Sequence, residues 1–316
     1  MRNFTSIQDV DDVNILVSEA IELKKNPFLF ENLGKRKTLG LIFLNPSLRT
    51  RISTQKAANN LGMNTMVMNL DKEGWALETE DGVVMNGHKA EHIKEAAAVL
   101  GQYCDIIGIR SFPKLENREE DYSENILKKL ISYTGTPIIS LETATRHPLQ
   151  SLADLMTIKE LSPNRRPKVV LTWAPHIKAL PQAVPNSFAE WMSDSNVDFV
   201  ITHPEGYELS DEFTKGAEII YEQDVALQDA DFVYVKNWSS YNNYGKILST
   251  DKNWMLTNKK LYYTGNARVM HCLPVRRDVE LASEVLDGQN SIVINQANNR
   301  VYAAQAVLKN ILENNF

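Results

Sequence analysis

Short apolar runs alternate with segments of helical periodicity along the whole chain. Runs of aliphatic and β-branched residues without polar interruption are typical of strands that are buried on both faces. The run at 38–44 precedes a helical pattern over 47–61 that ends before Gly62. The same order recurs in the second half of the chain, where a helix that begins with Pro148 precedes the run at 169–173.

The predicted elements fall into two successive blocks. Strands are predicted at 38–44, 65–70, 105–110, 137–141, 169–173, 199–202, 219–221, 232–235 and 269–272, and helices at 47–61, 91–103, 124–133, 148–161, 187–192 and about 300–312. Alternation of this kind predicts parallel sheets with helices on both faces. We therefore expect an α/β protein with two doubly wound parallel-sheet domains, which meet near residues 142–148 and have a cleft between them.

Composition and charge narrow the class of protein. Apolar residues make up 43% of the 316 residues and charged residues 23%, as in ordinary globular proteins. The formal net charge of -6 argues against a general binder of nucleic acid or membrane surfaces. The N-terminal residues do not resemble a signal peptide, and the longest apolar runs are too short to span a bilayer. Because Cys104 and Cys272 show no metal-ligand spacing, we expect a cytoplasmic protein without a metal.

Candidate chemistry lies where predicted strands end, since open parallel sheets bind ligands at the carboxyl ends of their strands. The first such place reads Ser47-Leu48-Arg49-Thr50-Arg51, where a loop opens directly into a helix. Backbone amides, hydroxyl groups and an arginine fork at a helix N-terminus suit the oxygens of a phosphate. Taken alone, the motif fits an ordinary capped helix with solvated arginines about equally well.

Two further strand ends carry histidines. His147-Pro148-Leu149-Gln150 lies at the expected domain junction, where the histidine and the glutamine can both face the cleft. His271-Cys272-Leu273-Pro274 lies at the end of the last predicted strand. Taken singly, the first motif is more often a capping or packing histidine, and the second a strand end with a buried thiol.

Together, the three motifs are specific in their order and spacing. They resemble the aspartate and ornithine carbamoyltransferase family over essentially the full chain. The resemblance implies a carbamoyl-phosphate-binding domain over 1–143, an acceptor-binding domain over 144–299, and a C-terminal helix, 300–316, that returns to the first domain. It also implies transfer of a carbamoyl group from carbamoyl phosphate to an amine, without a cofactor.

The same resemblance assigns the contacts to carbamoyl phosphate. They are Ser47, Leu48 through its backbone amide, Arg49, Thr50, Arg110, His147, Gln150, the backbone carbonyls of Cys272 and Leu273, and Arg300 at the opening of the final helix. Arg110, His147 and Thr50 are expected to be catalytic, because donors aimed at the carbamoyl oxygen stabilise the charge that builds there when the amine attacks. The departing phosphate can accept the amine proton, so no covalent intermediate is needed.

The acceptor side departs from the ornithine enzymes. Their Ser-Met-Gly loop does not occur in the sequence, and a proline-rich stretch at 173–187 stands in its place. This stretch resembles the N-acylornithine branch of the family, whose members are trimers with a knotted second domain. The resemblance assigns acceptor contacts to Glu142, His176 and Lys236, and delivers Trp75 into the carbamoyl-phosphate site of a neighbouring subunit. We therefore expect a homotrimer with shared sites.

The identity of the acyl group depends on Ala90, in a loop that also enters the neighbouring site. N-acetylornithine enzymes resemble each other in having glutamate at this position and N-succinylornithine enzymes in having proline, so alanine matches neither. Glutamate would fill the space and repel a succinyl carboxylate, whereas alanine does neither, and Arg276 is placed to pair with that carboxylate. We expect N-succinyl-L-ornithine as the acceptor, with N-acetyl-L-ornithine, or less favourably ornithine, as the alternative.

A regulator that only binds a phosphorylated metabolite is the alternative outside the enzymes. Such a sensor needs only the phosphate loop, whereas this chain also carries Arg110, His147 and Gln150. A dehydrogenase with a dinucleotide site is excluded, because no Gly-x-Gly-x-x-Gly follows any predicted strand.

Overall fold

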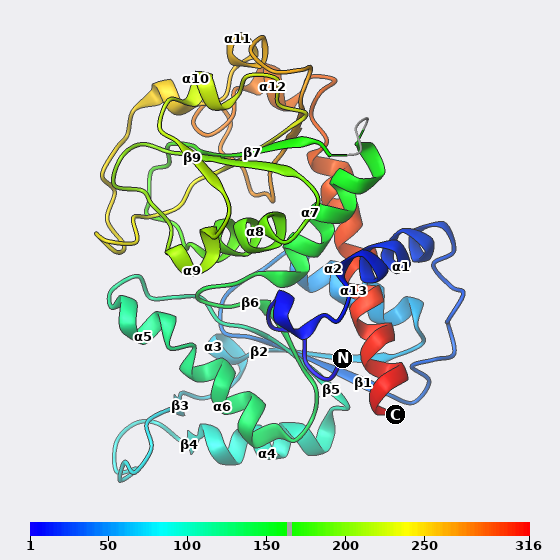
Figure 1. Cartoon of the computed structure of the whole chain (residues 1–316). Coiled ribbons are helices and arrows are strands. Elements are labelled where there is room, and N and C mark those ends of the chain that lie inside the picture. Colours follow the sequence, from blue (N-terminus) through cyan, green and yellow to red (C-terminus); the bar gives the residue numbers. More distant parts are fainter. Residues whose placement is uncertain (163–165) are drawn as a thin grey trace. The chain divides into compact units, whose positions relative to one another are not determined.

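The computed structural model describes residues 1–162 and 166–316, which form two compact units (Figure 1). The first unit comprises Met1–Pro113, Glu119–Leu149 and Arg300–Phe316, and the second comprises Lys114–Arg118 and Gln150–Asn299. Helix α13 (Val293–Asn315) contributes residues to both units, so the chain returns to the first unit after completing the second.

A four-stranded parallel sheet forms the centre of the first unit. Its strands lie in the order β2-β1-β5-β6, and Leu39 of β1 pairs with Ile106 of β5. The elements up to β6 are η1 (Ile7–Asp9), α1 (Val13–Lys25), β1 (Thr38–Phe43), α2 (Arg49–Asn60), β2 (Asn64–Asn69), α3 (Leu70–Glu73), β3 (Leu77–Glu78), β4 (Glu91–His92), α4 (Ile93–Tyr103), β5 (Ile106–Arg110), α5 (Arg118–Tyr122), α6 (Asn125–Thr134) and β6 (Ile138–Glu142).

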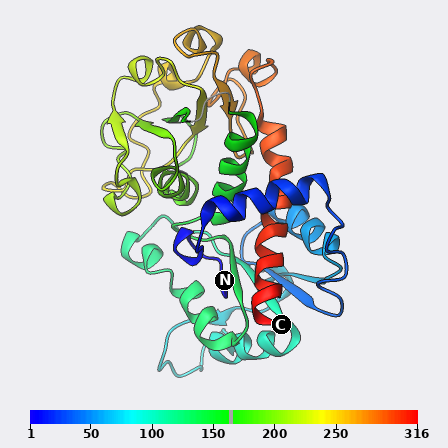
Figure 2. The same cartoon turned by 45° about the vertical axis from the view of Figure 1, so that its right-hand side comes forward.

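Helices cover both faces of this sheet, because its strands are apolar on both sides. On one face, Ile42, Ile107 and Ile109 pack with Ala97 of α4 and Leu127 of α6. Helices α1, α2 and α13 lie on the other face, as Figures 1 and 2 show. The doubly wound arrangement predicted from the alternating pattern is therefore confirmed for this unit.

Polar contacts fix the C-terminal part of α13 within the first unit. Gln305 accepts a hydrogen bond from Asn60 of α2 at 2.9 Å and donates to the carbonyl of Pro27 at 2.7 Å. Lys309 Nζ lies 3.3 Å from a carboxylate oxygen of Glu19 in α1, and both views show α1 beside this part of α13. These contacts hold the helix that carries Arg300 against the first unit.

The second unit is built around a five-stranded parallel sheet in the order β11-β10-β7-β8-β9. Val170, Val200 and Val233 line one face, while the ring of Phe188 in α8 packs against Phe199 and Tyr234 on the other. Its elements are α7 (Pro148–Leu161), β7 (Lys168–Trp173), α8 (Ala183–Ser193), β8 (Asp198–Thr202), α9 (Asp211–Thr214), β9 (Glu218–Ile220), α10 (Gln223–Ala226), β10 (Phe232–Lys236), η2 (Lys252–Trp254), α11 (Asn258–Leu261), β11 (Arg268–Met270), α12 (Ser283–Leu286) and the start of α13.

The predicted strands are all present, with ends that shift by one or two residues. The prediction that the final helix opens at Arg300 is wrong, since α13 begins at Val293. Asparagine and glutamine dominate its first turns and are weak indicators of a helix, so the apolar periodicity becomes visible only later. Among residues 1–162 and 166–316, no helix combines the length and apolarity that crossing a membrane requires.

Candidate active site

Basic and hydroxyl side chains of the first unit gather where its strands end. Helix α2 begins at Arg49 shortly after β1, with Leu48 as its N-cap residue. Arg110 is the last residue of β5, and Glu142 is the last residue of β6. Because these strands are parallel neighbours, their carboxyl ends bring the residues to one edge of the sheet.

Buried contacts join five residues into what we call the first-unit cluster: Thr50, Arg110, Glu142, His147 and Arg300. Arg110 Nη1 donates to Glu142 Oε2, and Arg300 Nη2 donates to Thr50 Oγ1. His147 Nε2 lies 3.5 Å from Arg300 Nη2 and 3.6 Å from Glu142 Oε2. Each of these residues is less than a tenth exposed. Two arginines against one carboxylate give the cluster an excess of positive charge, which suits an anionic ligand.

The histidine of this cluster is neutral at pH 7. Burial, followed by the charges of Arg300, Arg110 and Arg49, lowers the pKa of His147 well below its usual value. A neutral imidazole keeps one N–H donor, so it can donate to a developing oxyanion without adding a second charge to an already basic site.

A second cluster surrounds the turn that follows β11 in the second unit. Leu273 has a φ of +56°, which an apolar residue rarely adopts, and its N–H donates to His271 Nδ1 at 2.8 Å. A strained backbone that is held by a specific hydrogen bond is a candidate for ligand contact. The turn His271–Leu273 is therefore a candidate contact for a ligand.

Glu280 links this turn to basic residues. One of its oxygens lies 3.5 Å from His271 Nε2, and the other accepts the N–H of Arg276 at 2.9 Å. Burial raises the pKa of Glu280, but His271 and the charge of Lys236 outweigh it and bring the pKa to about 2. Arg276 Nε in turn donates to His176 Nε2 at 3.0 Å. We call His176, Lys236, His271, Arg276 and Glu280 the second-unit cluster. It is organised around the ionised, buried carboxylate of Glu280.

Replacing Glu280 with glutamine is expected to lower the free energy of unfolding by about 3 kcal/mol at pH 7, since one pKa unit is worth about 1.4 kcal/mol. The folded-state pKa is depressed, so this stabilisation is complete above the usual glutamate pKa of 4.5 and is lost as the pH falls towards 2. Urea unfolding of both proteins should show the difference shrink to roughly half near pH 3. A difference that stays constant over this range would contradict an ionised Glu280.

The first-unit cluster supplies cations and hydrogen-bond donors. Arginines, a hydroxyl group and a neutral imidazole can hold a phosphate and stabilise negative charge on a reacting oxygen. In the part of the chain that the structure describes, no group of three or more His, Cys, Asp or Glu side chains could hold a metal ion. The first-unit cluster by itself suits the binding of a phosphorylated ligand and the stabilisation of charge on a reacting oxygen.

Comparison with known proteins decides the family. Residues 2–160 match the carbamoyl-P binding domain of aspartate/ornithine carbamoyltransferases, and residues 181–311 match their Asp/Orn binding domain. The chain belongs to the aspartate/ornithine carbamoyltransferase family. The resemblance expected from the three sequence motifs is thereby confirmed.

Similar carbamoyltransferases include enzymes named for N-acylated ornithines. An N-succinylornithine carbamoyltransferase of Bacteroides fragilis (strain 638R) is 54% identical, over 99% of each chain. An N-acetylornithine carbamoyltransferase of Xylella fastidiosa (strain Temecula1 / ATCC 700964) is 33% identical, over 98% of each chain. A crystal structure of an N-acetyl-L-ornithine transcarbamylase mutant with PALAO has a TM-score of 0.93 at 32% identity, covering 98% of this chain and 100% of that one.

A second mutant of N-acetyl-L-ornithine transcarbamylase is also similar to this chain. It carries alanine in place of a glutamate and was solved with carbamyl phosphate and N-succinyl-L-norvaline. Its TM-score to this chain is 0.90 at 32% identity, covering 98% of this chain and 100% of that one.

In this carbamoyltransferase, Trp75 and Ala90 lie on an exposed loop of the first unit that is closed at its base. Strands β3 and β4 pair in parallel, and the N–H of Ala90 donates to the carbonyl of Ala76 at 3.2 Å. Trp75 Nε1 donates to Glu91 Oε2 at 2.9 Å. The two candidate residues are thus held by contacts within the loop.

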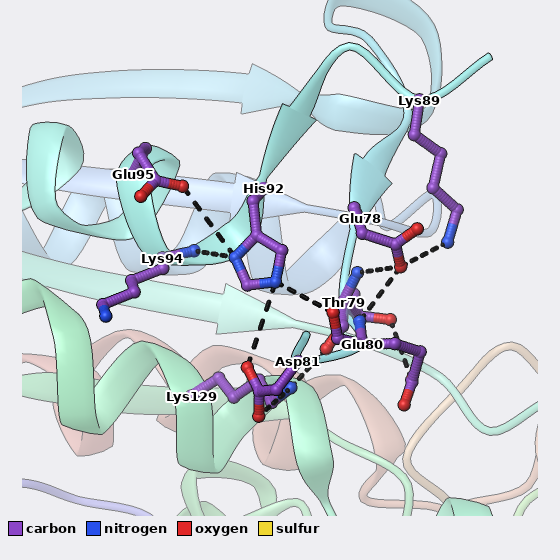
Figure 3. A network of polar contacts seen from close by, with 9 residues as sticks. All are labelled: Glu78, Thr79, Glu80, Asp81, Lys89, His92, Lys94, Glu95 and Lys129. Atoms are coloured by element: carbon purple, nitrogen blue, oxygen red, sulfur yellow. Dashed lines mark hydrogen bonds and ion pairs between the residues drawn. The ribbon is translucent and has the colours of Figure 1, made fainter. Parts of the chain in front are cut away.

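Figure 3 shows the polar network that anchors this loop. Glu78 accepts from Lys89 Nζ at 2.8 Å and from two backbone amides, and the Lys89 hydrogen bond is the main cause that lowers the pKa of Glu78 to about 2. His92 Nε2 lies 3.1 Å from the carbonyl of Glu80, and Lys129 of α6 lies 3.1 Å from Asp81. The network fixes the loop to α4 and α6, so Ala90 is presented on a supported rather than an isolated segment.

The structure distributes the sequence-predicted residues over three places. The first place is the first-unit cluster of Thr50, Arg110, Glu142, His147 and Arg300, with Ser47, Leu48 and Arg49 at the start of α2. The second place is the second unit, which contains Gln150, His176, Lys236, Cys272, Leu273 and Arg276. The third place is the anchored loop, which carries Trp75 and Ala90. Sequence reasoning missed Glu280. An acidic residue in an irregular segment gives no signal, because its importance arises only from the basic side chains around it.

Proposed function

We propose that this carbamoyltransferase transfers the carbamoyl group of carbamoyl phosphate to the side-chain amine of N-succinyl-L-ornithine. The products are N-succinyl-L-citrulline and phosphate, and the reaction serves arginine biosynthesis in the cytoplasm. The first-unit cluster carries this proposal, because it combines buried arginines, a hydroxyl and a neutral histidine in one place. The 54% identity to enzymes named N-succinylornithine carbamoyltransferase supports the choice of acceptor.

In the proposed reaction, Ser47, Arg49, Thr50 and the Leu48 amide bind the phosphate at the start of α2. Arg110, His147 and Thr50 donate to the phosphate and the carbamoyl oxygen, where negative charge builds as the amine attacks. Arg300 donates to the Thr50 hydroxyl and so fixes its orientation. Gln150 and the carbonyls of Cys272 and Leu273 bind the carbamoyl amine. The C–O bond to phosphate breaks, and phosphate leaves with the proton of the attacking amine.

The acceptor is assigned to Glu142, His176, Lys236 and Arg276. Lys236 is the last residue of β10 and binds the α-carboxylate of the acceptor. Arg276 is exposed and hydrogen-bonded to His176, so its guanidinium retains further donors for a second carboxylate. A succinyl group carries such a carboxylate, whereas an acetyl group does not.

N-acetyl-L-ornithine remains the alternative acceptor, because enzymes named for it are 33% identical over 98% of this chain. Two further observations favour succinyl: alanine at position 90 is smaller than glutamate, and an acetylornithine enzyme with alanine in place of a glutamate was solved with a succinyl compound. Steady-state kinetics with succinylornithine, acetylornithine and ornithine should give the highest kcat/KM for the first. A higher kcat/KM for acetylornithine would replace the proposed acceptor while keeping the reaction.

We also propose a homotrimer with active sites shared between subunits and a knotted second domain. Apolar side chains of the first unit are exposed at Leu48 (67%), the N-cap residue of α2, at Ile52 (57%) in α2 and at Met66 (56%) on the edge strand β2. An exposed edge strand with an apolar surface favours association. Trp75 is also exposed, at 59%, as a residue that completes a neighbour's site should be in a single chain.

Mixing two inactive variants tests this arrangement. If Trp75 completes the site of a neighbour, Trp75→Ala and Arg110→Lys subunits should reconstitute about a quarter of the wild-type activity when unfolded together and reassembled in equal amounts, since one in four sites receives both intact residues. Analytical ultracentrifugation should give three chains per particle. Mixed samples no more active than the separate variants would contradict shared sites.

A further inference from the structure

Helix α7 buries a carboxylate that no part of the proposed reaction uses. Asp154 is completely buried, two turns into this helix. Its Oδ1 atom accepts hydrogen bonds from Gln150 Nε2 and from Gln296 Nε2, both at 2.7 Å. All three residues belong to the second unit. A buried carboxylate that receives two N–H donors at one oxygen is a strong orienting group, because such charge-assisted bonds are short and stiff.

The carboxylate dictates which end of each glutamine faces it. A carboxylate accepts hydrogen bonds, whereas a glutamine amide has a donor end and an acceptor end. Asp154 therefore draws the Nε2 end of both glutamines and turns both Oε1 atoms away. Gln296 bears out this orientation independently, since its Oε1 accepts the backbone N–H of His271 at 2.9 Å.

The same constraint has a consequence for Gln150. Its Oε1, turned away from Asp154, is the acceptor end of the amide, and the amine end of a carbamoyl group requires an acceptor. With the opposite orientation, Gln150 would present N–H groups to the N–H groups of the ligand. Asp154 thus selects the one orientation of Gln150 that can bind a carbamoyl amine.

A tyrosine lies near both Asp154 and the turn at His271–Leu273. Tyr234 of β10 is fully buried, and burial followed by neighbouring Asp154 and Cys272 raises its pKa well above the usual value. One tyrosine thus lies beside both the carboxylate and the turn. Through the two hydrogen bonds of Gln296, Asp154 of α7 is linked to the backbone N–H of His271.

We propose that Asp154 is a positioning residue for the carbamoyl group: one oxygen fixes the orientation of Gln150 and, through Gln296, the His271–Leu273 turn. This inference rests on the proposed function, in which Gln150 and the carbonyls of that turn hold the carbamoyl amine. The two contacts come from segments far apart in the sequence, so a shared anchor keeps them at a constant separation. Misplacing a bound reactant by about 1 Å can lower the rate about 100-fold.

Two near-isosteric variants separate the effect of losing the hydrogen-bond acceptor at position 154 from the effect of changing the volume of the side chain. Asp154→Asn keeps an oxygen that can accept from both glutamines, whereas Asp154→Leu fills similar space without an acceptor. For the leucine variant we expect kcat to fall about 100-fold and phosphonoacetamide, a stable carbamoyl phosphate analogue, to bind about 10-fold more weakly. The asparagine variant should stay within about 5-fold of wild type in kcat and in analogue affinity, because it retains a side-chain oxygen that accepts hydrogen bonds. The KM for the substrate N-succinyl-L-ornithine should change little in either variant.

Thr157→Val is the matched control. Thr157 is buried in the same helix and accepts from Asn299 at 2.9 Å, so its loss should lower the melting temperature without changing kcat or analogue binding. If Asp154→Leu does not fold, Gln296→Met carries the test. It cuts the link to His271 and should lower kcat about 10-fold while Gln150 keeps its bond to Asp154.

The outcomes distinguish this inference from the proposed function. Analogue binding needs no acceptor, so an enzyme that binds phosphonoacetamide but does not carbamoylate succinylornithine contradicts only the proposed acceptor. Failure of the wild-type protein to bind the analogue overturns both. Leucine and asparagine variants that bind the analogue equally well, with equal kcat, overturn the positioning role alone, as does an unaltered kcat in Gln296→Met.

Discussion

Arg110→Lys is expected to lower kcat for carbamoyl transfer by about 100- to 1,000-fold, the usual effect of removing a donor aimed at a reacting oxygen. Lysine keeps the positive charge beside the buried carboxylate of Glu142, so the ion pair that supports the fold is retained. It loses the planar fork, which can bond Glu142 and a phosphate oxygen at the same time. The measurement is single-turnover formation of the carbamoylated product at saturating carbamoyl phosphate.

Arg277→Met serves as the control for this variant. Arg277 is an exposed arginine of the second unit that pairs with Asp287 at 2.7 Å. The Arg277→Met variant should have the kcat of the wild-type enzyme. If Arg110→Lys and Arg277→Met have the same kcat, the first-unit cluster does not stabilise the transition state, and the mechanism proposed for it is wrong.

Ala90→Glu is expected to lower kcat/KM for N-succinyl-L-ornithine by about 100-fold, because a like charge beside a desolvated carboxylate costs several kcal/mol. The value for N-acetyl-L-ornithine should change much less, since acetyl carries no charge. The anchored loop makes this change local: the contacts of Lys89 with Glu78 and of Glu91 with Trp75 flank Ala90 and do not involve its side chain. The quantity to measure is the ratio of kcat/KM for the two acceptors.

Ala90→Ser is the matched control, because serine is small and neutral and should leave the ratio near that of wild type. A glutamate variant with an unchanged ratio would remove the loop from the acceptor pocket. Loss of activity towards both acceptors, in equal proportion, would instead mean that the loop supports the fold or the assembly.

The sequence predicted the strands of the two large sheets well because buried parallel strands leave a signal that is local, whereas the two-residue strands β3 and β4 were not predicted and residues 91–92 were assigned to a helix. The run at 38–44 and the motif Ser47–Arg51 that follows it became β1 and the start of α2, and the helix predicted from Pro148 has the observed bounds. Helix α1 was not predicted, although Asp12 caps it by accepting from the amides of Asn14 and Ile15. Capping of this kind is visible in the sequence only when the apolar face that follows is continuous.

The relations between site residues could not be predicted in the same way. No sequence motif indicated that the carboxylate of Glu142 pairs with Arg110, because the ends of β5 and β6 meet only in the folded sheet. The orientation of Gln150 depends on Asp154 four residues on and on Gln296 in another helix. The motifs therefore identify Arg110 and Gln150 as site residues. The orientation of their side chains depends on hydrogen bonds to the buried carboxylates of Glu142 and Asp154, which the motifs do not show.

The most direct test is to incubate the purified protein with carbamoyl phosphate and N-succinyl-L-ornithine and to follow both products by mass spectrometry and phosphate release. Equal amounts of N-succinyl-L-citrulline and phosphate are predicted, at a rate that exceeds the rate with N-acetyl-L-ornithine. Phosphate release without any carbamoylated product would contradict the account, because the buried cations would then bind carbamoyl phosphate without delivering its carbamoyl group to an amine.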